Sequence, residues 1–279
     1  MEIGLSSAVF YPEVNTEDTL EIIKKLGFNT CEVFINSFLE CEDGFVDKLL
    51  RKKHELNIDI NSVHALSSLF EPFLFDPYKR RRDEMLLLFE KICKTGSKLG
   101  ASYYTFHGMK YKDFSCIDRE LAVEVYKKIA YIAGENNIKL AQENVSWCMS
   151  SDIDYLSFIK DKSIDNLFFT FDIKQAYKAN KEPKEYIRVM GNKLVNFHIN
   201  DRDEDHVCLL PLDGTVNYKE IFYELDNVNY DGNLIIEVYR NNFFSYNEIS
   251  DCKKKIRKIS IKPQLYVIIY KYKLKLNCK

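Results

Sequence analysis

Two histidines and four acids crowd the ten-residue stretch FHINDRDEDH, residues 197–206, at the end of the apolar run KLVNFHI. A short apolar run of this kind is typical of a buried strand, so His198 would sit at the strand's carboxyl end, with the acids on the loop behind it. Imidazole nitrogens and carboxylate oxygens bind divalent cations and move protons. The stretch therefore raises the question of what these titratable groups hold.

Five other apolar runs also end in a side chain of a metal-binding type. In chain order these are His64 in NSVHA, His107 in TFHG, Glu143 in AQENV, Asp172 in FTFDI and Glu237 in IIEVY. Taken singly, such a histidine is more often a hydrogen-bonded core residue, and such an acid is often a helix cap. Together they favour a metal site, because burying three carboxylates in one place without a cation is unfavourable and raises their pKa values.

Glu143, Asp172, His198 and Glu237 are accordingly the predicted metal ligands. Three carboxylates and one imidazole form an oxygen-rich set that suits Mn2+ best, with Mg2+, Co2+ and Zn2+ as competitors. Such a set leaves coordination positions open for substrate oxygens. One divalent metal ion is therefore the expected cofactor.

The elements that must position these residues alternate regularly. Amphipathic helices are predicted over residues 16–27, 78–100 and 118–137, with Thr16 as the N-cap of the first and Gly27 as its stop. Alternating strands and helices predict a parallel sheet, and eight units in roughly 250 residues favour a single (β/α)8 TIM barrel over a doubly wound sheet. The eight predicted strands are residues 2–8, 30–35, 58–65, 102–108, 138–145, 167–173, 194–200 and 233–239.

The barrel is expected to occupy residues 1–258 as one catalytic domain, because no glycine- or proline-rich linker marks a second one. Residues 259–279 fall outside the count of strand and helix units. Their lysines alternate with apolar residues, as in an exposed strand or a basic tail. We expect a C-terminal extension that packs outside the barrel, lacks fixed structure or contacts a partner subunit, and we assign it no chemistry.

The composition argues against several classes of partner. The chain has 40 basic and 42 acidic residues, so no overall charge attracts it to nucleic acid or to an anionic membrane. Its N-terminus lacks the pattern of a signal peptide, and no apolar stretch approaches the ~18 residues of a transmembrane helix. The eight cysteines form no CxxC pair, which is typical of reduced thiols in a cytoplasm. A cytoplasmic protein with a small-molecule partner is expected.

Seven short segments together resemble a known family: SVH, FHG, ENV, FDIKQA, FHINDRD, LLPLDGTVNY and IIEVYR. In this order they are similar to the sugar phosphate isomerase/epimerase group of xylose isomerase-like barrels, which includes ketose 3-epimerases, hydroxypyruvate isomerases and inosose dehydratases. Endonuclease IV is related to the group. The resemblance covers about residues 1–258 and implies the same four metal ligands that the charge argument selects.

The resemblance also implies roles for single residues. Glu143 and Glu237 would face each other across the substrate as acid and base, and Glu32, His64 and His107 would line the pocket. The family commonly has a histidine three residues after the aspartate of the sixth strand, where this chain has Gln175. A glutamine can hydrogen-bond a sugar hydroxyl but is a poor metal ligand and carries no proton.

The reaction implied is isomerisation or epimerisation of a sugar, a sugar phosphate or a polyol. A proton next to a carbonyl would be removed by one glutamate and returned by the other, through a metal-stabilised enediolate. Arg202 and Arg240 are candidates for binding substrate oxygens or a phosphate, and pairing with a loop acid such as Asp201 or Asp203 is an equal alternative.

Three further residues next to strand ends carry expectations. Lys174 is expected to be a solvated residue at a helix start rather than a Schiff-base lysine. Phe10 and Tyr11 follow the first predicted strand and are placed to cap a ligand.

Two alternative functions stay open. An endonuclease IV-like cleavage of abasic DNA would need three metals, whereas Gln175 and the altered loop after the seventh strand remove much of the third site. The acidic run NDRDED, residues 200–205, would also repel phosphates. A catalytically silent sugar-binding barrel is the other alternative, because fold does not fix function. A homo-oligomer is possible in either case.

Overall fold

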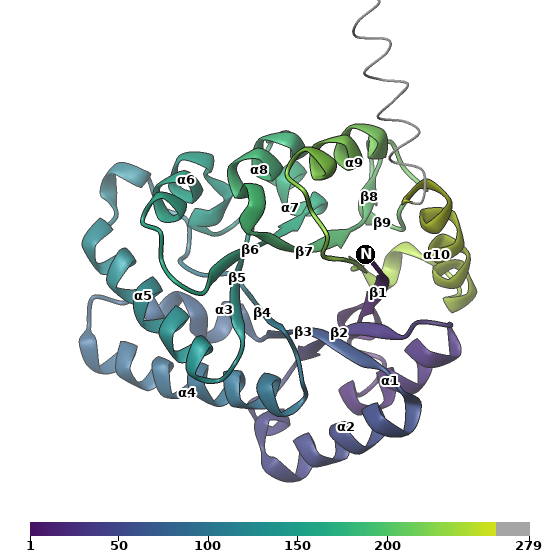
Figure 1. The fold of residues 1–279 in the computed structure, drawn as a ribbon, viewed down its shortest axis with the longest axis horizontal. Coiled ribbons are helices and arrows are strands. Elements are labelled where there is room, and N and C mark those ends of the chain that lie inside the picture. Colours follow the sequence, from purple (N-terminus) through teal and green to yellow (C-terminus); the bar gives the residue numbers. More distant parts are fainter. Residues whose placement is uncertain (261–279) are drawn as a thin grey trace, which may run out of the picture.

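Eight parallel strands close into a barrel in the computed structural model, which describes residues 1–260 (Figure 1). Neighbouring strands follow the order β1-β10-β7-β6-β5-β4-β3-β2, so the chain winds once around the barrel. The strands are β1 Ile3–Ser6, β2 Thr30–Ile35, β3 Asp59–Ala65, β4 Tyr103–Phe106, β5 Lys139–Glu143, β6 Leu167–Asp172, β7 Leu194–Ile199 and β10 Asn233–Ile236. The predicted (β/α)8 barrel is confirmed.

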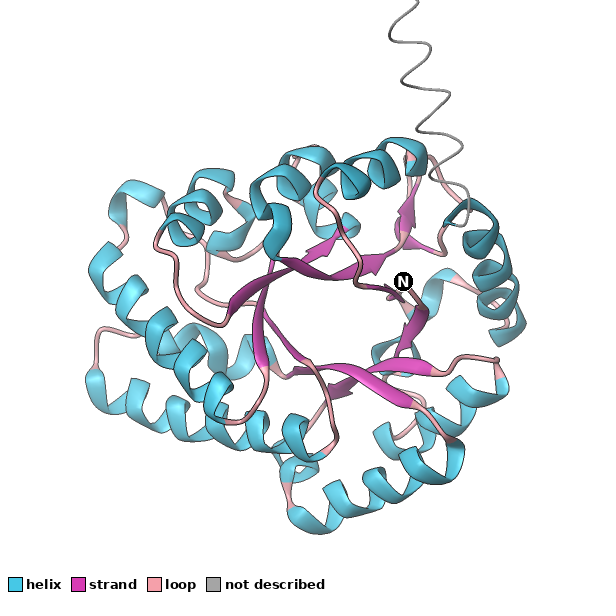
Figure 2. Ribbon diagram, in the orientation of Figure 1, coloured by secondary structure: helices cyan, strands magenta, loops and turns pink. Residues whose placement is uncertain are grey.

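Helices surround the barrel on its outside (Figure 2). Two short strands, β8 Asp201–Arg202 and β9 Val207–Leu209, form a separate antiparallel hairpin in the loop after β7. None of the helices within residues 1–260 combines the length and the apolar character needed to span a bilayer. The helices are α1 Thr16–Lys25, α2 Asp43–Leu56, α3 Ser67–Phe70, α4 Lys79–Lys98, α5 Arg119–Glu135, α6 Ile153–Asp161, α7 Ile173–Lys178, α8 Pro183–Met190, α9 Tyr218–Asn227 and α10 Tyr246–Ser260.

The predicted N-cap of α1 is wrong by one residue. Asn15 has the extended backbone of an N-cap, and Thr16 is the first helical residue. The Thr16 hydroxyl donates to Glu40 Oε1 at 3.0 Å, so a tertiary contact uses the group that would otherwise cap the helix. Most of the predicted basic extension, residues 261–279, lies outside the described residues, and the predicted domain boundary at residue 258 stays a prediction.

The hydrophobic core lies between the strands and the helices, because alternate residues of a strand point to opposite faces. Fully buried examples are Val63, Tyr104, Phe169, Phe197 and Ile236, one from each of five strands. Burying a side chain of this size stabilises the fold by about 1.5–3 kcal/mol. The outer faces of the strands therefore hold the barrel to its helices.

The inside of the barrel is polar below its carboxyl-terminal end. Glu32 on β2 accepts hydrogen bonds from Ser62 Oγ at 2.7 Å and from Thr105 Oγ1 at 2.9 Å, and all three side chains are fully buried. Asn196 Oδ1 on β7 accepts from Asn61 Nδ2 at 3.0 Å. A buried polar group without a partner destabilises a fold, so this layer specifies how the strands sit relative to one another.

Candidate active site

The four predicted metal ligands meet at the carboxyl-terminal ends of four strands. Glu143 ends β5, Asp172 ends β6, His198 lies near the end of β7, and Glu237 directly follows β10. Parallel pairing sets Asp172 beside His198, and the pairing of Ile235 with His198 brings Glu237 to the same end. One ligand atom from each of the four lies within 4.8 Å of the others. The structure thus brings the four side chains together.

His198 Nδ1 lies at the centre of this group. It is 2.7 Å from Glu237 Oε2, 3.3 Å from Glu143 Oε1 and 3.8 Å from Asp172 Oδ2. A single ring nitrogen has at most one proton to share among three carboxylates.

Several of these central atoms have no hydrogen bond. Among the described residues, three such atoms are buried and form no hydrogen bond: His198 Nδ1, Asp172 Oδ2 and Glu237 Oε2. Their contacts are ion pairs instead, between His198 Nδ1 and Glu237 Oε2 at 2.7 Å and between Asp172 Oδ2 and Lys174 Nζ at 3.2 Å. Buried polar atoms without a hydrogen bond are unfavourable, and a divalent cation would bind all three at once. The donor set and these three atoms therefore fit a divalent metal ion.

Neighbouring side chains orient two of the ligands. Glu32 Oε2 lies 3.1 Å from His198 Nε2, which favours a proton on Nε2 and turns the lone pair of Nδ1 toward the carboxylates. Asp172 Oδ1 accepts from Asn200 Nδ2 at 3.0 Å and from the backbone N–H of Gln175 at 3.2 Å. Asp172 Oδ2 makes neither of these contacts, and its neighbour is Lys174 Nζ at 3.2 Å, so this oxygen is the one that would bind a cation.

Without a cation, the electrostatics of the site are set by its histidines and one lysine. Burial raises the pKa of Glu143, but hydrogen bonds from His107 and His198 outweigh it and lower the pKa to about 2. Burial also opposes ionisation of Glu237, whose pKa the charges of Lys174 and His198 lower to about 2. Burial lowers the pKa of His198, yet Glu32 and Glu237 raise it well above its ordinary value. Without a cation both glutamates are thus ionised, and the positively charged form of His198, with a second proton on Nδ1, is favoured. A cation would take the place of that second proton.

A second group of ligand types adjoins the first and shares Glu143. His64 Nε2 lies 2.7 Å from His107 Nε2, which is 2.9 Å from Glu143 Oε2. These three residues are also placed to hold a metal ion. Glu143 would then bridge two cations, because Oε1 faces His198 and Oε2 faces His107.

The site opens on one side. The side chains of His107 and Glu237 are 13% and 14% exposed, whereas those of Glu143, Asp172 and His198 are at most 1% exposed. A substrate would therefore reach the buried ligands past His107 and Glu237.

Aromatic rings border the site, and sequence reasoning did not identify them. Phe34 packs against His64 with ring centroids 4.7 Å apart, Trp147 packs against His107 at 5.6 Å, and Tyr239 lies 5.2 Å from the ammonium group of Lys174. The position of Phe34 could have been predicted from the sequence, because Phe34 lies two residues beyond Glu32 and therefore points to the same face of the strand.

The remaining predicted substrate-binding residues differ in their surroundings. Gln175 is 8% exposed, and its Oε1 accepts from the backbone N–H of Ser146 at 3.0 Å. The guanidinium group of Arg202, an exposed residue, lies 4.0 Å from the Tyr177 ring centroid. Arg240 Nε donates to Glu13 Oε2 at 2.7 Å. These side-chain contacts of both arginines lie outside the ligand cluster.

The two loop acids considered as partners for these arginines have other roles. Asp201 is buried and accepts backbone N–H groups from Arg202, Leu212 and Val216 at 2.7–2.9 Å. Asp203 pairs with His206, with Oδ1 3.0 Å from Nδ1. Within residues 1–260, neither Arg202 nor Arg240 makes a side-chain pair with Asp201 or Asp203, because the loop backbone and His206 occupy both carboxylates. The alternative of pairing with a loop acid nevertheless holds for Arg240, whose partner is Glu13.

Two expectations about residues beside strand ends are wrong. Lys174 is 5% exposed rather than solvated, because α7 begins directly after Asp172 and directs this side chain to the carboxylates. Phe10 is fully buried and packs edge-on against Tyr246 of α10, at 5.2 Å between centroids. It therefore belongs to the core and does not cap a ligand, whereas Tyr11 is 58% exposed.

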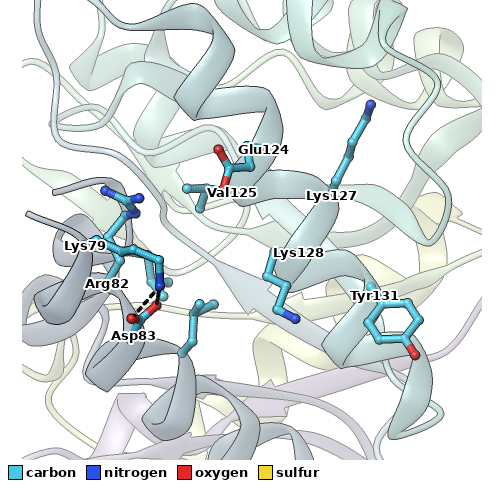
Figure 3. Close-up of a pocket in the computed structure, with 10 residues that line it drawn as sticks. Lys79, Arg82, Asp83, Glu124, Val125, Lys127, Lys128 and Tyr131 are labelled. Carbon is cyan, nitrogen blue, oxygen red and sulfur yellow. Dashed lines mark hydrogen bonds and ion pairs between the residues drawn. The ribbon is translucent and has the colours of Figure 1, made fainter. Parts of the chain in front are cut away.

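A groove of about 570 Å³ on the outside of the barrel has a different character (Figure 3). It runs between α4 and α5 and presents Lys79, Arg82, Lys127 and Lys128. Lys79 is paired with Asp83 at 2.7 Å. The groove lies away from the cluster of carboxylates and histidines. We place the candidate site at that cluster, because its side chains can bind a metal ion and transfer protons.

A closed parallel barrel with its reactive side chains at the carboxyl ends of the strands is the arrangement of TIM-barrel proteins. Comparison with known families agrees, since residues 20–259 match the model of the xylose isomerase-like TIM barrel, and this chain belongs to that family. The resemblance inferred from the seven sequence segments is thereby confirmed. Among curated proteins, an uncharacterized protein of Methanocaldococcus jannaschii is 24% identical over an alignment of 253 residues, which covers 85% of this chain and 83% of the relative.

Similar solved structures cover the whole barrel. A D-tagatose 3-epimerase-like protein superimposes with a TM-score of 0.76 at 22% identity, covering 98% of this chain and 100% of that one. The D-psicose 3-epimerase of Clostridium cellulolyticum H10 gives a TM-score of 0.73 at 18% identity, covering 98% and 99%. An L-ribulose 3-epimerase gives 0.77 at 16% identity, covering 98% of both chains. At these identities the likeness establishes the fold.

Proposed function

We propose that this protein is a metal-dependent isomerase or epimerase of a sugar, a sugar phosphate or a polyol. The observation that carries the proposal is that the two carboxylate oxygens of each glutamate face different partners. Glu143 Oε1 and Glu237 Oε2 face His198, whereas Glu143 Oε2 and Glu237 Oε1 face away from it, toward His107 and Lys174. Each glutamate thus has one oxygen for a cation and one for a proton.

A divalent cation held by Glu143, Asp172, His198 and Glu237 would act as a Lewis acid and stabilise negative charge beside the carbon that loses its proton. Mn2+ is the proposed ion, with Mg2+, Co2+ and Zn2+ as competitors. One glutamate removes a proton from the carbon next to the carbonyl, and the other returns it. Return to the opposite face of that carbon gives an epimer, and return to the adjacent carbon gives an isomer.

The other residues of the site support this chemistry in the proposal. His64, His107 and Gln175 hydrogen-bond substrate hydroxyls, and Glu32, which is fully buried beneath them, orients His198. Substrate binding by Arg202 and Arg240 stays a prediction. Two structural neighbours are named for ketoses, D-psicose and L-ribulose. Ketoses are therefore the first substrate class to test.

Exchange of carbon-bound hydrogen tests the reaction whatever its product is. Wild-type protein with Mn2+ in D2O is expected to place deuterium next to the carbonyl of at least one of D-tagatose, D-psicose, D-fructose and L-ribulose, as followed by proton NMR. Glu143→Gln and Glu237→Gln should each slow exchange by about 10² to 10⁴, because general acid–base groups contribute this much.

Glu84→Gln, a substitution of an exposed glutamate on α4, is the matched control and should leave exchange unchanged. Absence of exchange with every ketose and polyol, in protein shown to bind Mn2+, would contradict the proposed reaction. It would favour the silent sugar-binding barrel.

The group of His64, His107 and Glu143 favours a second candidate, a multi-metal phosphodiester hydrolase related to endonuclease IV. Two metal ions about 3.5–4 Å apart are typical of such enzymes, and a bridging Glu143 fits that arrangement. Metal analysis of the purified protein separates the candidates. One ion per chain supports the isomerase, whereas two or three ions together with cleavage of abasic DNA support the hydrolase.

A further inference from the structure

Lys174 is a buried cation inside the proposed metal centre. Its Nζ lies 3.2 Å from Asp172 Oδ2 and 3.5 Å from Glu237 Oε1, and the side chain is 4% exposed. Asp172 Oδ2 is the oxygen directed to His198, and Glu237 Oε1 is the oxygen that the proposed function assigns to proton transfer. The ammonium group therefore contacts both the proposed cation-binding part and the proposed proton-transfer part of the site.

The balance of charge gives this position a function. Three carboxylates contribute three negative charges to the ligand set, a divalent cation supplies two positive charges, and Lys174 supplies the third. The charges of the ligand set, the cation and Lys174 thus sum to zero, and the negative charge that forms during proton removal develops beside the fixed positive charge of Lys174. Preorganised charges of this kind, in a site that excludes water, strongly stabilise a transition state.

The contacts of Lys174 also leave its ammonium group able to donate a hydrogen bond to a substrate. An ammonium group has three N–H donors, and two carboxylate oxygens are its contacts of ion-pair length. The ring centroid of Tyr239, a residue that is 43% exposed, lies 5.2 Å from Nζ. One donor is accordingly available to a substrate oxygen.

We propose that Lys174 is a catalytic residue, whose ammonium group donates a hydrogen bond to the substrate oxygen that becomes negative when the adjacent carbon loses its proton. The proposal rests on the proposed function. The proton passes from carbon to a glutamate, the electron pair of the broken C–H bond forms a C=C bond, the π pair of the carbonyl moves onto its oxygen, and Lys174 keeps its own proton. The same fixed charge weakens the binding of a divalent cation at the neighbouring carboxylates.

Lys174→Met separates these effects from a structural role, because methionine retains an unbranched chain without the charge. Calorimetric titration of the metal-free protein with Mn2+ should show binding about tenfold tighter than in the wild type, since a repelling charge is gone. At saturating Mn2+, deuterium exchange into the ketose should nevertheless be about 100-fold slower. Lys174→Arg keeps the charge, so its Mn2+ affinity should stay near that of the wild type and its exchange should be partly retained.

Lys160→Met is the matched control, because Lys160 donates to the carbonyl oxygen of Val189 at 2.7 Å and belongs to α6 on the outside of the barrel. It should change neither quantity. A purely structural role for Lys174 predicts weaker Mn2+ binding in Lys174→Met, and that result overturns the proposal, as does an unchanged exchange rate at saturating Mn2+. Wild-type protein that binds Mn2+ but exchanges no sugar would instead show that the proposed function itself has failed.

Discussion

At the scale of the residue, the site is defined by what surrounds His198. Glu32 holds one ring nitrogen, and three carboxylates surround the other. The sequence predicted the carboxylates, because each lies at the end of an apolar run. It did not predict the role of Glu32 in orienting His198, since that contact joins β2 to β7 across the inside of the barrel.

The pH dependence of metal binding follows from the proton on His198. Glu32 and Glu237 raise its pKa well above the ordinary value, and a metal ion binds only the neutral ring, so below that pKa each Mn2+ displaces one proton. Mn2+ affinity should therefore rise about tenfold per pH unit and level off above the pKa. Titrations in two buffers of different ionisation enthalpy measure the released proton. An affinity that stays constant across this range would contradict the prediction.

At the scale of the element, residues within strands were predictable and residues just beyond them were not. The ends of β5, β6 and β7 place Glu143, Asp172 and His198 at one end of the barrel whatever the loops do. The position of Lys174 depends on α7 starting without any loop, and that of Phe10 on the 3-10 helix Ser7–Phe10 turning inward. Local patterns do not encode these turns, because tertiary packing decides them.

Glu71 shows how one buried acid fixes a neighbouring loop. It lies in the 3-10 helix Glu71–Phe75, and its Oε2 accepts the backbone N–H groups of His107 at 2.7 Å and Gly108 at 3.0 Å. Its Oε1 accepts from the Tyr104 hydroxyl at 2.5 Å. Gly108 has a φ of +91°, and an added Cβ would lie 2.9 Å from Gln142 Oε1, so this loop has little freedom to rearrange.

Glu71→Gln is expected to destabilise the protein, because an amide cannot accept with both of its heavy atoms. At least one buried donor loses its partner, which should lower the free energy of unfolding by about 1–3 kcal/mol. Urea denaturation measures the change. Glu84→Gln, on the exposed surface of α4, should stay within about 0.5 kcal/mol of the wild type. Equal effects of the two substitutions would show that the contacts of Glu71 do not stabilise the fold.

At the scale of the whole molecule, a cation at the site would join four strands. Its ligands come from β5, β6, β7 and the residue after β10, which are separate in sequence and meet only in the folded barrel. If these residues hold Mn2+ as proposed, the ion would bind the native state and not the unfolded chain. A concentration 100 times the Kd should increase the free energy of unfolding by about 2.7 kcal/mol.

Thermal unfolding with Mn2+ and with EDTA measures this stabilisation. His198→Ala should lose it, since the substitution removes a ligand from the centre of the site. His54→Ala, an exposed histidine on α2, should retain it. Equal stabilisation of both variants by Mn2+ would place the ion somewhere other than the proposed site.

The buried carboxylate of Asp201 also matters for how such a protein can diversify. By accepting the backbone N–H groups of Arg202, Leu212 and Val216, it joins the start of the β8–β9 hairpin to the segment that follows the hairpin, so that residues 201–216 form one loop module. The proposed ion-binding residues lie on the strands and at their immediate ends, outside that module. Replacing the hairpin with one of different sequence is therefore a way to change which substrates the site accepts while the proposed ion-binding residues are kept.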